Sequence, residues 1–210
     1  MKPSKFAAAV AILCVAVTVS CGIDDDGGTD VAELDTTTAP ASPRWDNYRG
    51  VYVPFTADGP TQNVSSVAPT GYKQVPQGAV VAAMQAQVRL ALTADDSWSP
   101  VARTLVLPGP GRDAFTTSRV LMSTTKPADP AETAQFAGFR VEGWSDQATT
   151  VWLATRMPQG QLSASPTRMV WRGGDWKVEL PATQTPDAEG RVPTDPVVIL
   201  TLQGYTEFHR

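Results

Sequence analysis

The side chain with the clearest predicted chemistry is the thiol of Cys21, because it follows a leader typical of exported proteins. Lys2 and Lys5 precede an uncharged run over residues 6–19, and the small residue Ser20 comes directly before Cys21. A positive segment, an apolar segment and a small-residue cleavage site together make a secretory signal peptide. A cysteine directly after that site resembles a lipobox, whose thiol receives a diacylglycerol. Two acyl chains anchor a protein stably, so we expect lipidation at Cys21 and a location on the extracytoplasmic face of the cell membrane.

One position of the lipobox leaves a second interpretation open. Thr18 stands where such boxes usually carry Leu, and Thr18 with Ser20 also suits an ordinary signal peptidase. The alternative is therefore plain secretion with an unmodified Cys21. The apolar run of 14 residues is shorter than the roughly 20 that cross a bilayer, so it does not predict a membrane span.

Catalytic chemistry has few candidate residues. His209 is the only histidine, and both cysteines lie in or at the end of the leader, so the body has no thiol nucleophile and no Cys/His set for zinc. Asp95 and Asp96 form the densest acidic pair of the body, which we interpret as a solvated helix terminus. Glu142 and Asp146 would have to face each other across a cleft to cleave a glycoside, and the sequence does not predict that. We expect no catalytic residue, no metal and no cofactor, and we expect that the protein is not an enzyme.

Charge and composition divide the chain into three parts. Six acidic side chains and no Lys or Arg lie between Cys21 and Pro43, among many Gly, Thr, Ala and Pro residues. Such a segment cannot bury enough apolar surface to offset chain entropy. The sequence therefore predicts a signal peptide over 1–20, a lipidated cysteine with a disordered acidic linker over 21–43, and a single domain over 44–210. Acidic and basic side chains balance in that domain, so no nucleic-acid partner is expected.

Apolar periodicity places the helices in the first half of the domain. The spacing predicts a helix over 76–93 that starts at Pro76. Its core-facing set is Val81, Met84, Val88 and Leu92, and its opposite side carries Gln85, Gln87 and Arg89. A second short helical piece follows Asp95-Asp96-Ser97, and a third helix is expected over 113–123 with Phe115, Leu121 and Met122 facing inward.

Strand patterns dominate the second half. A short strand or extended arm is expected over 48–55. Alternation then predicts strands at 139–144, 151–156, 167–171 and 176–180, with a fifth at 197–202. Gly173 and Gly174 suit a hairpin turn with positive φ. Helices followed by consecutive antiparallel strands predict the α+β class, with the helices packed on a curved sheet of four to five strands.

The sheet tryptophans are the strongest candidates for binding. Simple alternation places Trp144 and Trp152 on the face opposite the apolar set, with Arg140 and Arg156 beside them. Exposed aromatic patches mark contact sites. The alternative is that the sheet wraps around these rings, or that a bulge changes the alternation, and the rings are core.

Several motifs resemble those of an uncharacterised family of actinobacterial envelope proteins. The motifs are Trp45-x-x-Tyr48-x-Gly50-Val51-x-Val53-Pro54, Gly71-Tyr72-x-x-x-Pro76-Gln77-Gly78-Ala79-Val80, Trp171-x-Gly173-Gly174-Asp175-Trp176-Lys177-Val178 and Leu202-x-Gly204-Tyr205-Thr206. Members of that family are lipoproteins or membrane-anchored proteins, often associated with conjugative elements. The resemblance implies a cone-shaped domain similar to nuclear transport factor two, and no catalytic residues.

The resemblance supports three hypotheses. The first is a non-catalytic scaffold or accessory domain with envelope protein partners, in conjugative transfer or secretion. The second is a lipoprotein that binds a small apolar ligand in the cone, in a pocket lined by Met84, Phe115, Trp171 and Trp176. The third is a cone-fold enzyme that uses a buried carboxylate.

Overall fold

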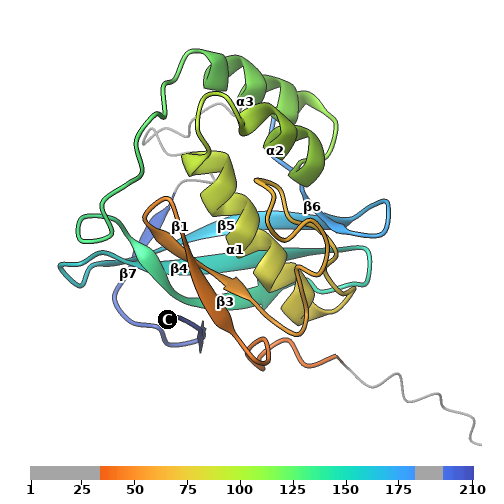
Figure 1. Cartoon of the computed structure of the whole chain (residues 1–210). Helices are drawn as coiled ribbons and strands as arrows, with labels where there is room; N and C mark the ends of the chain where they lie inside the picture. Colours follow the sequence, from red (N-terminus) through yellow and green to blue (C-terminus); the bar gives the residue numbers. More distant parts are fainter. Residues whose placement is uncertain (1–33, 183–195) are drawn as a thin grey trace, which may run out of the picture. The chain divides into compact units, whose positions relative to one another are not determined.

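The computed structural model describes residues 34–182 and 196–210, and Figure 1 shows their arrangement. The predicted leader, Cys21 and the first part of the linker lie outside the described residues. In chain order the elements are β1 (Arg44–Tyr48), β2 (Val51–Phe55), α1 (Pro76–Leu92), α2 (Trp98–Leu105), α3 (Pro110–Val120), β3 (Gln135–Glu142), β4 (Ala148–Arg156), β5 (Leu162–Trp171), β6 (Trp176–Val178), β7 (Val197–Ile199) and β8 (Thr206–Glu207). The α+β class is confirmed.

The short strand expected within residues 48–55 is β2, and it forms a hairpin with β1, a strand that the alternation did not predict. β1 and β2 pair antiparallel, and Tyr48 lies opposite Val51. Between them Arg49 and Gly50 have φ values of 50° and 103°. Positive φ at both central residues is what a two-residue hairpin turn requires, and the sequence pattern gave no strong sign of it. Val51 and Val53 are buried, as their alternation predicted.

The main sheet is antiparallel and has six strands. Its order is β6-β5-β4-β3-β8, and β7 pairs with β5 beside β6. The predicted hairpin at Gly173 and Gly174 joins β5 to β6, with φ values of 64° and 77° at the two glycines. β8 adds one strand to the four to five that were expected. The sequence did not predict it, because a strand of two residues leaves no periodic pattern.

Helix α1 crosses one face of the sheet, as Figure 1 shows. It is buried on nearly all sides, so the prediction that Gln85 and Arg89 face solvent was wrong. Gln85 Nε2 donates to the carbonyl of Pro54 over 2.8 Å, and Arg89 Nη1 donates to the carbonyl of Val67 over 3.0 Å. The β1–β2 hairpin and the loop before α1 cover the side that the helix would otherwise show to water.

The inward residues expected for the third helix were also misplaced. Leu121 is 85% exposed and Met122 is 61% exposed. Helix α3 begins at Pro110 and ends at Val120, so these two residues follow its last turn. The buried side chain at this end is Arg119, whose Nη2 donates to the carbonyl of Thr93 over 2.8 Å.

The last part of the predicted linker is ordered on the domain. Gln77 Nε2 donates to the carbonyls of Asp35 and Thr38 over 2.8 and 3.1 Å. Thr206 Oγ1 donates to the carbonyl of Thr37 over 2.7 Å, and Pro40 is buried. These contacts correct the expectation of disorder for residues 34–43, because polar backbone groups of this segment find partners on α1 and β8.

The C-terminal segment partly covers the second face of the sheet. β7 pairs with β5 and β8 pairs with β3, so residues 200–205 pass from one edge of the sheet to the other. Figure 1 shows this segment, in blue, on the side away from the helices. The small residues Ala154 and Ala164 are buried on that side. The C-terminal segment therefore covers part of the face that we expected to be exposed to solvent.

Candidate functional site

The core around Met84 of α1 and Trp176 of β6 is packed. Met84 and Trp176 are at most 1% exposed, and the rings of Trp171 and Trp176 lie 5.4 Å apart in an edge-on arrangement. The four residues predicted to line one pocket therefore do not assemble around a cavity. Three of them pack in or against the core, and Phe115 alone lies elsewhere.

Phe115 lines a groove beside the core, which we call the α3 groove. Its volume is about 1030 Å³. Apolar side chains that contribute to it include Leu90 of α1, Leu107 in the loop after α2 and Leu180 after β6, and Thr167 of β5 lines it from the sheet. Arg112 and Arg168 also line it, and Arg168 Nε lies 3.9 Å from Glu179 Oε2. This is a mostly apolar concavity with a charged rim.

Trp152 and Arg140 lie together on the face away from the helices, as predicted. They are directly opposite each other on β4 and β3, and the Arg140 guanidinium lies 5.3 Å from the centre of the Trp152 ring. Trp152 Nε1 donates to Glu142 Oε2 over 2.5 Å. Arg140 also lies 5.4 Å from the centre of the Tyr205 ring, which the C-terminal segment brings to this face. We call these four side chains the aromatic face.

Trp144 does not join the aromatic face. Its ring centre lies 5.5 Å from that of Trp176, and it packs against the core. β3 ends at Glu142, and Gly143 takes a φ of 61°, so the alternation used for the prediction stops before Trp144. The core alternative weighed for this ring is the one the structure shows.

Arg156 is also separated from the aromatic face. It lies at the end of β4 and lines a second groove of about 780 Å³, which we call the hairpin groove. The other residues of that groove come from the β1–β2 hairpin, the start of β3, the loop after β4 and the C-terminal residues His209 and Arg210.

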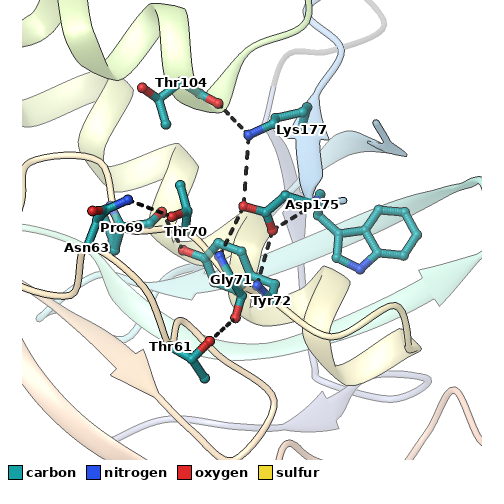
Figure 2. Close-up of polar contacts among 10 residues, drawn as sticks. Thr61, Asn63, Pro69, Thr70, Gly71, Tyr72, Thr104, Asp175 and Lys177 are labelled. Atoms are coloured by element: carbon teal, nitrogen blue, oxygen red, sulfur yellow. Dashed lines mark hydrogen bonds and ion pairs between the residues drawn. The ribbon is translucent and has the colours of Figure 1, made fainter. Parts of the chain in front are cut away.

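Asp175 is the one buried carboxylate among the described residues, and Figure 2 shows its contacts. Its Oδ1 accepts from the backbone N–H groups of Tyr72 and Trp176 over 3.1 and 3.0 Å. Its Oδ2 accepts from the backbone N–H of Gly71 over 3.1 Å and lies 3.8 Å from Lys177 Nζ. Lys177 Nζ in turn donates to the carbonyl of Thr104 over 2.7 Å.

This cluster joins segments that are far apart in the chain. Gly71 and Tyr72 precede α1, Asp175 belongs to the β5–β6 hairpin, and Thr104 lies in α2. Both carboxylate oxygens already accept hydrogen bonds, which gives Asp175 a structural role. Burial raises the pKa of the Tyr72 hydroxyl, so this group stays protonated.

The remaining acidic candidates are also committed to structure. Asp95 accepts from Arg119 Nη1 over 3.0 Å, from Ser123 Oγ over 2.9 Å and from the Thr124 backbone over 2.8 Å. The bonds from Thr124 and Ser123 are the main causes that hold the pKa of Asp95 below its usual range. His209 is exposed, and its Nε2 lies 3.8 Å from Glu207 Oε2.

Residues 34–182 and 196–210 contain neither a candidate metal site nor a candidate membrane-spanning helix. No three His, Cys, Asp or Glu side chains of this part gather as a metal site would require. Of the helices in these ranges, none has both the length and the apolar character that crossing a bilayer demands.

Tyr205 and Asp175 are the two residues that sequence patterns did not bring into a site. Tyr205 stands in the last of the four motifs, and Asp175 directly follows the predicted Gly173-Gly174 turn. The compact run Gly173-Gly174-Asp175-Trp176 did mark a tight hairpin, but nothing local indicates that its carboxylate meets Gly71, which is 104 residues earlier.

Comparison with known proteins gives a family and no function. No curated protein matches the chain, and no solved structure matches it. One family model, described as a domain of unknown function (DUF8175), matches residues 18–207, which is most of the chain and the whole described domain up to β8. The chain therefore belongs to the DUF8175 family.

Proposed function

We propose that this protein is a non-catalytic binding domain that a lipid on Cys21 holds at the extracytoplasmic face of the cell membrane. In this proposal it acts as a scaffold or accessory component for envelope protein partners. The resemblance drawn from its motifs implies conjugative transfer or secretion as the setting, and a cone-shaped domain like nuclear transport factor two. The leader with Cys21 and the aromatic face support the proposal.

The aromatic face carries the binding part of this proposal. Its tryptophan, the arginine over the tryptophan ring and the tyrosine beside it are the residue types enriched at the energetic centres of protein interfaces. The carboxylate of Glu142 accepts from the indole N–H and holds the ring in place. Trp152 is partly exposed on this face of the sheet. The opposite face of the sheet packs against the core. The aromatic face is therefore preorganised, because its side chains already hold one another in place.

Replacing Cys21 tests the anchor. In cells that make the full-length protein, Cys21→Ser should move it from the membrane fraction to the soluble extracytoplasmic fraction, since no thiol remains to carry acyl chains. Mass spectrometry of the wild-type N-terminal peptide should show a diacylated cysteine. An unmodified Cys21 in a soluble wild-type protein would instead support plain secretion.

Truncating Trp152 tests the contact surface. Full-length protein crosslinked mildly in membranes should recover an envelope protein, and Trp152→Ala should weaken that interaction by about 2 kcal/mol, roughly thirtyfold in affinity. Leu121→Ala is the matched control, because Leu121 is an exposed apolar side chain on the helical side. Equal recovery with both variants would contradict a role for the aromatic face.

The α3 groove favours a second candidate function, the binding of a small apolar ligand. Its volume of about 1030 Å³ is in the upper part of the range of natural ligand sites, and its walls are mostly apolar. The site differs from the predicted one in its lining, because Phe115 is the one predicted lining residue that it keeps. A small molecule released from the purified protein, with no Trp152-dependent partner, would favour this candidate over the scaffold.

A further inference from the structure

We propose that the hairpin groove is a second contact site, separate from the aromatic face, and that it binds an acidic segment of a partner protein. The groove lies between the β1–β2 hairpin, the edge of β3 at Gln135, the end of β4 at Arg156 and the C-terminal residues. Its volume of about 780 Å³ is enough for several side chains of an extended peptide.

The walls of the groove are flat and apolar. They include Trp45, Tyr52 and Phe136, together with Pro130, Met157 and Pro158. The Trp45 ring is fixed from behind by Phe208, whose ring centre lies 5.0 Å away. Aromatic rings held in this way offer large contact areas at low entropic cost, so they suit apolar or proline residues of a peptide.

The rim of the groove is cationic. Arg156 and Arg210 line it and carry the positive charge, and none of the described lining residues is Asp or Glu. The Arg210 guanidinium lies 4.0 Å from the centre of the Tyr52 ring. A guanidinium stacked on a ring keeps its N–H groups at its edge, where they can form paired bonds to a carboxylate.

Among the described residues, one acidic side chain pairs with a residue of this rim. Glu207 Oε2 lies 3.8 Å from His209 Nε2, and the backbone oxygen of Arg210 lies 2.8 Å from His209 Nδ1. These contacts engage the imidazole, while the Arg210 guanidinium contacts the Tyr52 ring. The two arginines therefore supply the charge complementarity that selects an anionic partner.

The groove is held open by polar contacts in its floor. Gln135 Oε1 accepts from the backbone N–H of Tyr52 over 3.0 Å, and Gln135 Nε2 donates to the carbonyl of Gly50 over 3.0 Å. One side chain of β3 thus fixes the hairpin that forms the opposite wall. A preformed groove loses little conformational entropy on binding.

The shape and the chemistry together favour a peptide over a lipid surface. A bilayer is flat on this scale, so its headgroups would reach the arginines but not the aromatic walls. A peptide segment that carries Asp or Glu beside aromatic or proline residues satisfies both.

Selection from random linear peptides displayed on phage tests this proposal. The target is the full mature chain with Cys21→Ser, so binding does not depend on the anchor. Selected peptides should combine Asp or Glu with aromatic residues or Pro. A synthetic selected peptide should lose about tenfold or more in affinity with the double variant Arg156→Gln/Arg210→Gln, and should bind more weakly at high salt.

Two controls separate the outcomes. Arg172→Gln removes an exposed arginine at the opposite end of β5 and should leave peptide affinity unchanged. Selected peptides without acidic residues, or an affinity that the double variant leaves intact, would overturn the proposal. So would charge-dependent binding to phosphatidylglycerol vesicles in the absence of any selected peptide, because that result would assign the groove to a membrane surface.

Discussion

Asp175→Ala should lower the free energy of unfolding by about 3 kcal/mol or more. The substitution leaves the backbone N–H groups of Gly71, Tyr72 and Trp176 without their acceptor, and each buried donor left unpaired costs about 1–3 kcal/mol. It also removes the anionic partner of Lys177. Urea denaturation should show a lower midpoint with an unchanged m value, as expected for a change in stability alone.

Two related variants separate charge from shape at this position. Asp175→Asn keeps the size of the side chain but turns one acceptor into a donor that faces other donors, so it should also be clearly destabilising. Asp146→Asn is the matched control: its carboxylate is exposed in the β3–β4 turn, and its effect should stay within about 0.5 kcal/mol. A stable Asp175→Asn protein would show that the carboxylate cluster is dispensable for the fold.

Gly78→Ala should lower the free energy of unfolding by about 2 kcal/mol. Helix propensity alone would predict a stabilising effect. In an ordinary helix this change stabilises by about 1 kcal/mol. Here a Cβ on Gly78 would lie 2.1 Å from the carbonyl oxygen of Lys73, a backbone atom that cannot rotate away. That same carbonyl accepts from Trp176 Nε1 over 2.9 Å, so relief of the overlap would strain a core hydrogen bond.

Denaturant midpoints again measure this effect, and amide hydrogen exchange locates it. Exchange should quicken at Tyr72, whose N–H bonds to Asp175 in the same cluster. Ser118→Ala on the exposed side of α3 is the control for propensity alone, and it should be neutral or slightly stabilising. A Gly78→Ala protein more stable than wild type would mean that the backbone of the loop before α1 moves away from the new Cβ at little energetic cost.

These two predictions concern one structural unit. The backbone around Lys73 is held between α1, which approaches at Gly78, and the β5–β6 hairpin, which contributes Asp175 and Trp176. The loop before α1 is thereby tied to a hairpin about a hundred residues later. We infer that this tie fixes how the helical layer sits on the sheet.

The sequence by itself determined the types and order of most elements. Pro76 and the apolar spacing marked α1, Gly173 and Gly174 marked the β5–β6 turn, and helices followed by strands indicated α+β. These features depend on neighbours within a few residues, which is why periodicity and turn chemistry reveal them.

The tertiary structure alone decided which side chains meet. It buried Gln85 and Arg89 beneath the β1–β2 hairpin, moved Trp144 into the core, and placed Tyr205 beside Arg140. In each case the neighbour comes from a distant part of the chain or from a backbone turn that breaks the alternation. A local pattern predicts the face of a helix or strand on which a side chain lies. Long-range packing decides which other segments cover that face, and it therefore decides which surfaces remain for binding.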